Sequence, residues 1–275
     1  TAYGNDAIGG DDDGLSDGAN PGDWGGIVFR DDSGLEDQGI FLNSVNNANI
    51  SYGGGSVFVN SVQQVFSAIH AEAARPTIWQ NTIAFSADSA ISADPRSFED
   101  SQFTNGSFVM DRHGLEIFDN HIANNSVNGL FVRINTPYGS TINKLDVPAI
   151  FNDKITHVIT ENLQIYGAPG GQMDESGNPT INGRLKIDPG TVIKLSGARI
   201  EAERGSAQLI AEGTEANPII FTSLSDDRYG AGTTFDTSND GFDTSDPTNL
   251  PYGPGNWGGI IFNAASSGSI DHALI

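Results

Sequence analysis

The chain has 275 residues with 35 acidic and 13 basic side chains, so its formal net charge at pH 7 is −22. Such a surface repels nucleic acids and anionic lipids and attracts divalent cations or cationic partners, although acidity also keeps a β-rich protein soluble. The chain has no cysteine for a disulfide or a thiolate metal site, and no run of about 18 apolar residues to span a membrane. With 34 glycines and few runs of helix-forming residues, we expect almost no α-helix.

The first segment, residues 1–22, is rich in Gly and Asp and leads into a Trp-Gly-Gly-Ile block that begins at Trp24. A similar polar segment, residues 229–255, leads into a second such block at Trp257. A further match follows each block, at residues 44–50 and 269–275. It lies about eight residues farther from the block in the first copy than in the second, so we expect these extra residues to form a loop between Arg30 and Asn43. We expect both tryptophans to cover the end of a structural coil, meaning one turn of a repetitive β-structure, rather than to stack on carbohydrate. Trp79 is then the better candidate for an aromatic side chain exposed on the surface.

A shorter repeat lies between the two blocks. Four residues recur with a constant spacing of 39: Ile78, Asn81, Ile83 and Ile91 match Ile117, Asn120, Ile122 and Leu130. Ile69 and Ile91 are 22 residues apart, the length of a single coil, so residues 94–114 are expected to form a long loop within the next coil. We expect Asn81 and Asn120 to stack at the same turn of neighbouring coils, although both could be independent surface turn residues.

The stretch from Gly183 to Ser223 predicts a series of short parallel strands. Apolar runs separated by Gly, Pro, Asn or Ser occupy residues 185–187, 192–195, 198–202, 209–211 and 219–222. Their length fits three strands per coil of a solenoid, in which each coil buries its apolar face against the next. Nine residues are therefore expected to form one narrow core: Ile78, Ile83, Ile117, Ile122, Val192, Ile200, Leu209, Ile219 and Phe221.

The motifs Pro189–Lys194, Leu209–Thr214, Pro218–Ser223 and Asn256–Phe262 resemble the right-handed parallel β-helix repeats of large secreted bacterial surface proteins and adhesins. The resemblance covers most of the chain and implies an all-β solenoid over residues 1–275. Within it, residues 1–166 carry long loops, 167–182 form a linking loop, and 183–275 form regular coils and the start of the next repeat. It implies little about activity.

Acidic loops before the two Trp blocks are the strongest candidates for a binding site. Asp236, Ser238 and Asp240 place oxygen atoms at alternate positions before Gly241, as in the first half of a calcium-binding loop, and Asp243 follows closely. The match is partial, because Ser replaces the usual Asp or Asn and no Glu occupies the twelfth position. Asp11 and Asp13 form a weaker counterpart near the N-terminus, and solvated acidic turns are the alternative at both places.

An enzyme remains an alternative, because parallel β-helices include polysaccharide lyases and glycoside hydrolases. The candidate catalytic residues cluster in sequence at Asp111, Arg112, His113, Asp119 and His121. Glycoside hydrolysis requires two carboxylates at a defined separation, which sequence does not show. An outward groove that gathers several carboxylates with a Lys or Arg would favour the enzyme, and its absence would favour a structural role.

We therefore expect a structural or adhesive element of an extracellular fibre, sheath or cell-surface repeat protein, stiffened by calcium. Ice or mineral binding ranks last, because Thr occupies only some coil positions. The expected partners are neighbouring copies stacked head to tail and cell-surface glycans. The sequence starts without an initiator methionine or signal peptide, and Ile275 interrupts the second copy in mid-coil, so we also expect a segment of a longer protein.

Overall fold

The structure is a computed structural model that describes residues 18–59, 62–65, 67–105, 108–135, 143–169, 173, 175–176, 183–241 and 253–275. These residues form an all-β protein with mostly parallel sheets. The only helical elements among them are three short 3-10 helices: η1 (Asp31–Ser33), η2 (Glu36–Gln38) and η3 (Pro95–Phe98). The expectation of almost no α-helix is thus confirmed for the described residues.

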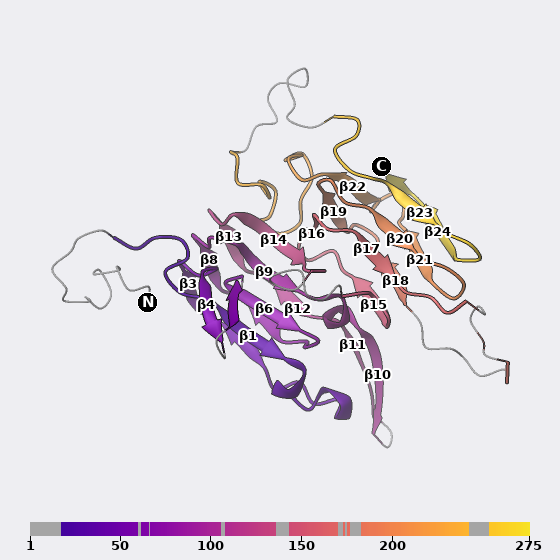
Figure 1. The fold of residues 1–275 in the computed structure, drawn as a ribbon, viewed down its shortest axis with the longest axis horizontal. Helices are drawn as coiled ribbons and strands as arrows, with labels where there is room; N and C mark the ends of the chain where they lie inside the picture. The colour runs from indigo at the N-terminus through magenta and orange to yellow at the C-terminus, as the bar shows by residue number, and fades with distance from the viewer. Residues whose placement is uncertain are drawn as a thin grey trace.

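One parallel sheet, which we call the long sheet, runs through the whole molecule. Its strands follow one another in chain order, and in Figure 1 the colour passes from indigo to yellow along the long axis of the molecule. In spatial order its eight strands are β1 (Ile27–Arg30), β6 (Ile69–Glu72), β9 (Ser89–Ala93), β14 (Val127–Val132), β16 (His157–Ile159), β19 (Val192–Leu195), β22 (Ile219–Ser223) and β25 (Ala273–Leu274).

Between strands of the long sheet, the chain adds strands to parallel sheets on other sides, and we call each such circuit a coil. Coils 1 to 3 each contribute one strand to each of two side sheets. The first side sheet contains β2 (Ser44–Asn46), β7 (Thr77–Trp79) and β12 (Glu116–Phe118), and the second contains β3 (Asn49–Ser51), β8 (Thr82–Ala84) and β13 (His121–Ala123). In coils 4 to 7 the side strands are β17 (Leu163–Ile165), β20 (Ile200–Ala202) and β23 (Ile260–Phe262), and β15 (Pro148–Phe151), β18 (Arg184–Ile187), β21 (Gln208–Glu212) and β24 (Ser267–Asp271). The strands predicted over residues 183–223 all occur.

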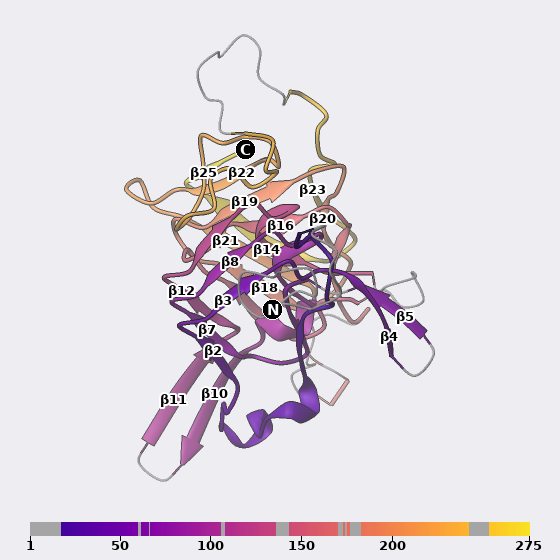
Figure 2. The same cartoon turned by 90° about the vertical axis from the view of Figure 1, so that its left-hand side faces the viewer.

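Two antiparallel hairpins interrupt the coils. Strands β4 (Ser56–Val59) and β5 (Val62–Val65) extend from coil 1, and β10 (Asp100–Asn105) and β11 (Phe108–His113) extend from coil 3. Figure 2 shows the two hairpins projecting away from the coils in different directions. The second hairpin, together with η3, forms the long insertion that the sequence places at residues 94–114.

The strand register confirms the short repeat. Ile78 pairs with Ile117, Ile83 with Ile122 and Ile91 with Leu130, and Ile69 pairs with Ile91 as a 22-residue coil requires. The spacing of 39 therefore corresponds to one coil that carries an insertion.

The predicted asparagine ladder is present at the turn between the side strands. Asn120 Oδ1 accepts hydrogen bonds from the backbone N–H of Asn81 at 3.0 Å and from its side-chain amide at 2.9 Å. Asn81 Oδ1 in turn accepts from the N–H of Ala48 at 3.0 Å. The amides thus satisfy backbone groups that the sharp turn leaves out of the strand pairing.

The core confirms eight of the nine predicted residues. All nine are buried, and all except Val192 belong to one continuous apolar cluster. The prediction that Val192 points into the core was wrong. Ile193 and Leu195 point into that cluster, whereas Val192 lies with Lys194 on the outer face of β19. A four-residue strand with apolar groups on both faces carries no alternation from which its inner face can be read.

The long repeat does not correspond to a whole-coil repeat. The first Trp block opens β1 in the long sheet, but the second opens β23 in a different sheet, so Asn49 pairs with Thr82 while its counterpart Leu274 pairs with Ile220. What the copies share is local: both tryptophans are partly buried and pack against the core. The glycine constraint is not shared, since a Cβ at Gly26 would lie 2.1 Å from the Ser67 carbonyl oxygen, whereas a Cβ at its counterpart Gly259 would meet nothing within 4 Å.

The coils are not equally connected. Strands β12 and β13 end their sheets on one side, β15 and β17 begin theirs on the other, and among the described strands only those of the long sheet pair across this boundary. We call the boundary between coils 3 and 4 the junction. It is filled by an antiparallel bridge between Glu99 and Ala149 and by the ring of Phe98, which lies 4.7 Å from that of Phe151.

Candidate functional site

The segment after β22, residues 224–241, lies against earlier coils, and we call it the strap. Thr234 and Thr156 exchange hydrogen bonds, with the Thr156 N–H donating to Thr234 Oγ1 at 3.1 Å and Thr156 Oγ1 donating to the Thr234 carbonyl at 2.9 Å. Further along, the Asn128 N–H donates to the Thr237 carbonyl, and Thr233 Oγ1 donates to the Asn120 carbonyl. The strap therefore reaches from coil 7 back to the edge of coil 3.

Three aspartates of the strap converge as a candidate metal centre. Asp227, Asp236 and Asp240 each offer a carboxylate oxygen, and these oxygens lie within 4.8 Å of one another. Asp236 Oδ1 and Ser238 Oγ are buried atoms with no hydrogen-bond partner in the structure. Carboxylate and hydroxyl oxygens are hard ligands of the kind that calcium prefers, so the cluster could hold a cation.

A buried lysine adjoins the candidate metal centre. The Lys194 side chain is fully buried, and its Nζ lies 4.0 Å from Asp227 Oδ1 and donates to the Phe235 carbonyl. Burial lowers the pKa of Lys194 to about 8, against the raising effect of four neighbouring aspartates. One ammonium offsets part of the charge of the three carboxylates and leaves an excess that a divalent cation would neutralise.

The structure brings together part of the predicted metal set. Asp236, Ser238 and Asp240 lie in one cluster, whereas Asp243, Asp11 and Asp13 fall outside the described residues. Sequence reasoning missed Asp227, which the pattern of alternating oxygens does not include. The adjacent pair Asp226-Asp227 directly after a predicted strand was the available signal.

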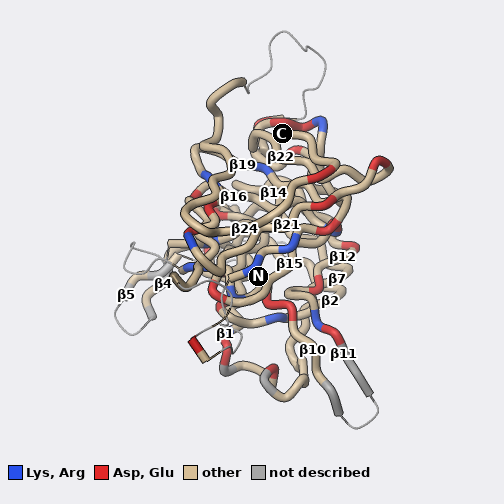
Figure 3. The backbone as a smooth tube through the Cα atoms, turned by 90° about the vertical axis from the view of Figure 1, so that its right-hand side faces the viewer, with Lys and Arg blue, Asp and Glu red and all other residues tan. Residues whose placement is uncertain are grey.

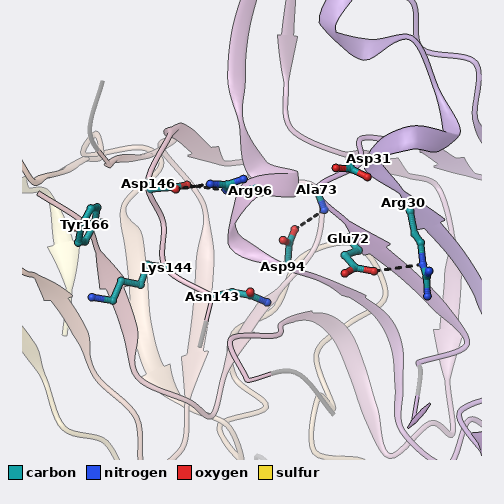
Figure 4. Close-up of a pocket in the computed structure, with 10 residues that line it drawn as sticks. All are labelled: Arg30, Asp31, Glu72, Ala73, Asp94, Arg96, Asn143, Lys144, Asp146 and Tyr166. Atoms are coloured by element: carbon teal, nitrogen blue, oxygen red, sulfur yellow. Dashed lines mark hydrogen bonds and ion pairs between the residues drawn. The ribbon is translucent and has the colours of Figure 1, made fainter. Parts of the chain in front are cut away.

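A second candidate site is a charged groove beside the ends of the long-sheet strands. Two cavities of about 630 and 620 Å³ adjoin there and share Asp31, Ala73, Arg96 and Asp146 in their linings. Figure 4 shows the larger cavity, with Arg30 and Glu72 near one end and Lys144 and Tyr166 near the other. An outward groove with several carboxylates and basic residues is the feature expected to favour an enzyme.

The charged groups of the groove are largely paired with one another. Arg96 binds Asp146 through two hydrogen bonds of 2.9 and 2.6 Å, and Arg30 lies 3.5 Å from Glu72. Asp94 Oδ1 accepts from the N–H of Ala73 at 2.8 Å and from the N–H and hydroxyl of Ser97, which caps η3. Burial raises the pKa of Asp94.

The five residues named as catalytic candidates do not form one site. Asp111, Arg112 and His113 lie on β11, and each contacts a different neighbouring side chain. Asp111 accepts a hydrogen bond from Gln102, the Arg112 guanidinium lies 2.7 Å from the Glu116 carboxylate, and His113 Nδ1 lies 2.6 Å from Asp100 Oδ1. Asp119 and His121 line a separate cavity of about 430 Å³ next to the strap. Asp119 is a turn residue with φ of 54°, so strand alternation does not place it on the same face as His121.

Charge is distributed over the whole molecule. Figure 3, which views it from the C-terminal side, shows acidic and basic positions interspersed along the tube.

Within the described residues, no helix is long and apolar enough to cross a membrane. In the comparisons with known proteins, no family model, curated protein or solved structure matches the chain.

Proposed function

We propose that the chain is a right-handed parallel β-helix that serves as a rigid structural or adhesive segment of an extracellular surface protein. The observation that carries the proposal is the strand order: the chain returns to the long sheet after each passage through the side sheets. One continuous core runs along these coils, so bending would require neighbouring coils to separate. A rod of this kind suits a fibre, sheath or adhesin.

Calcium at the strap belongs to the same proposal. Asp227, Asp236 and Asp240 supply carboxylates, Ser238 supplies a hydroxyl, and Asp243 is close enough in sequence to supply another oxygen. The ion would relieve the repulsion among the aspartates and fix the strap against coils 3 to 6. Its effect is mechanical, because the strap joins coils that are far apart in sequence.

Thermal unfolding with and without calcium tests this assignment. Saturating calcium is expected to raise Tm, because a ligand that binds only the folded state stabilises it. Asp240→Ala is expected to reduce the rise, and Asp271→Ala, an exposed aspartate outside the cluster, to preserve it. An unchanged Tm of the wild type at saturating calcium would remove calcium from the proposal and leave the β-helical rod in place.

Head-to-tail stacking completes the structural proposal. The outermost coil leaves Phe262 and Ile270 exposed at 42% and 36%, although their neighbours Ala202 and Ala211 are buried in the core cluster. A further coil, from the same polypeptide or from a second copy, would pair with these edge strands and cover the apolar groups. Electron microscopy of native material should show filaments, and closed dimers would contradict this arrangement.

A carbohydrate-active enzyme is the second candidate, favoured by the groove. Asp94 is a buried carboxyl group with a raised pKa, the property of a general acid, and Asp146 lies in the lining of the same cavity. Polysaccharide cleavage, measured as release of new chain ends, is expected to disappear in Asp94→Asn. Since Asp94 also caps η3, the melting temperature of that variant must be compared with the wild type.

A further inference from the structure

The groove runs along the coil axis over several coils, which is the shape that an extended polymer would need. Its lining comes from successive coils: Arg30 ends β1, Glu72 ends β6, Asp94 follows β9, Lys144 precedes β15 and Tyr166 follows β17. These positions belong to coils 1 to 5, and neighbouring parallel strands are about 4.8 Å apart, so the groove extends over about 19 Å. It therefore lies along the coil axis and suits a linear ligand rather than a compact one.

The charges of the groove favour an uncharged ligand. The larger cavity has four carboxylates and three basic groups in its lining, and two pairs, Arg96 with Asp146 and Arg30 with Glu72, are already in contact. A polyanion would need unpaired cations and would approach a chain with a net charge of −22. A polycation would need carboxylates that are not already held, whereas Asp94 accepts three hydrogen bonds.

The same groups can bind hydroxyls. The pair with Asp146 uses two of the five N–H donors of Arg96, and carboxylates accept more than one hydrogen bond, so donors and acceptors alternate along the groove. Tyr166 is 38% exposed at one end of the groove, and Lys144 Nζ lies over one face of its ring, 4.8 Å from the ring centroid. Sugars combine hydroxyl groups with apolar ring faces, and aromatic rings stack on such faces.

From this geometry we infer that the groove binds a linear, uncharged oligosaccharide of about four units along the coil axis. The inference rests on the proposed extracellular role and names the ligand class of its adhesive surface. Binding requires no cleavage, so the groove can serve adhesion with its ion pairs intact.

Calorimetric titration with oligosaccharides of defined length tests the inference. The probes are neutral β-linked glucose, xylose and N-acetylglucosamine oligomers, with oligouronates and glucosamine oligomers as the anionic and cationic counterparts. Affinity for at least one neutral series is expected to rise with length and to level off at about four units, because the groove ends there. It should not change with salt concentration, since an uncharged ligand has no charge to screen.

Substitutions locate the binding site. Arg96→Gln and Tyr166→Ala are each expected to weaken binding about tenfold. Phe118→Ala is the matched control, because this ring is 36% exposed and lines a different cavity. Melting temperatures identify any variant that fails to fold, and Asp146→Asn provides a second change to the same ion pair.

Three results would overturn the inference: no binding of any neutral series, binding only of charged oligomers, or binding that the groove variants leave unchanged. Binding of oligouronates alone would assign the groove to acidic glycans, and binding of glucosamine oligomers alone to cationic ones. None of these outcomes affects the calcium measurement, which tests the metal assignment, or the filament measurement, which tests the stacking of the coils, so failure here is distinguishable from failure of the proposed function.

Discussion

At the scale of single residues, two buried imidazoles contribute to the response of the protein to pH. Burial lowers the pKa of His157 to about 3, and burial together with the nearby Arg133 lowers that of His70 to about 3. His157 stacks on Phe151 with ring centroids 4.4 Å apart, and the His70 ring lies 2.8 Å from Ser92 Oγ. Both imidazoles are therefore neutral in the folded protein at neutral pH.

Acid should destabilise the fold through these groups. In the unfolded chain a histidine binds a proton near pH 6.5, whereas the folded protein holds His157 neutral down to about pH 3. Between these values the unfolded state binds more protons, so stability is lost as the pH falls. His157→Gln should reduce the slope of the free energy of unfolding by about 1.4 kcal/mol per pH unit, as measured by urea unfolding from pH 6.5 to 4.

The control for His157 is an exposed histidine. His121→Gln makes the same substitution at an exposed position of β13 and so controls for the loss of an imidazole outside the core. Equal slopes for the wild type and His157→Gln would show that the folded state accommodates a charged imidazole in the core.

At the level of single residues, the sequence predicted a side-chain contact only where the same residue type recurred at the spacing of a coil. Asn81 and Asn120 could be predicted to stack because both positions carry asparagine at the spacing of a coil. Asn125 has the same role at the following turn, where its Oδ1 accepts from the Ser86 N–H at 2.9 Å and its amide donates to the Ile83 carbonyl at 3.0 Å. The matching position in the preceding coil is a serine, so no recurring side chain pointed to it.

At the scale of elements, the strap shows why the candidate site could be predicted only partially. Alternating oxygens identified Asp236, Ser238 and Asp240, because their spacing is local in sequence. Lys194 and Asp227 join them only because the strap folds back over β19, a contact that depends on the path of a loop. The groove was equally hidden, since its residues come from strand ends and loops of five different coils.

The strap is expected to detach when its threonine contact is removed. Thr156 is fully buried, and its hydroxyl donates to Thr234 and accepts from the Ala231 N–H at 2.9 Å. Thr156→Val keeps the shape but loses these bonds and leaves buried strap groups unsatisfied, which costs about 1–3 kcal/mol. Limited proteolysis should then cleave within residues 228–241 faster than in the wild type.

An exposed threonine supplies the comparison for that experiment. Thr82→Val on β8 makes the same chemical change at an exposed position, and it should leave the cleavage rate unchanged. If Thr156→Val is cleaved no faster than the wild type, the strap is held by its other contacts, such as the Asn128 amide to the Asp236 carbonyl at 2.9 Å.

At the scale of the whole molecule, the junction divides the coils into two groups. The sequence showed this division only as a change from the repeat of 39 to the regular runs after Gly183, because strand pairing between sheets is not local. Coils within each group pair on several sides, whereas in the described residues coils 3 and 4 pair through β9 and β14 of the long sheet and through the single bridge between Glu99 and Ala149. In stacked architectures, stability is approximately a sum of coil terms and interfaces between neighbours, so the weakest interface sets where the chain opens first.

Hydrogen exchange with one core truncation on each side of the junction tests this division. Ile83 in coil 2 and Ile200 in coil 6 are both fully buried, and replacing either with Ala should cost about 2–5 kcal/mol. Ile83→Ala should speed exchange in β7, β8 and β12 while the amides of β18 to β21 stay protected, and Ile200→Ala should do the reverse. The junction confines each effect because, in the described residues, backbone pairing crosses it only between β9 and β14 and at the bridge between Glu99 and Ala149. Equal acceleration on both sides after either substitution would mean that the rings of Phe98, Phe151 and His157, together with the strap, couple the two groups into one cooperative unit.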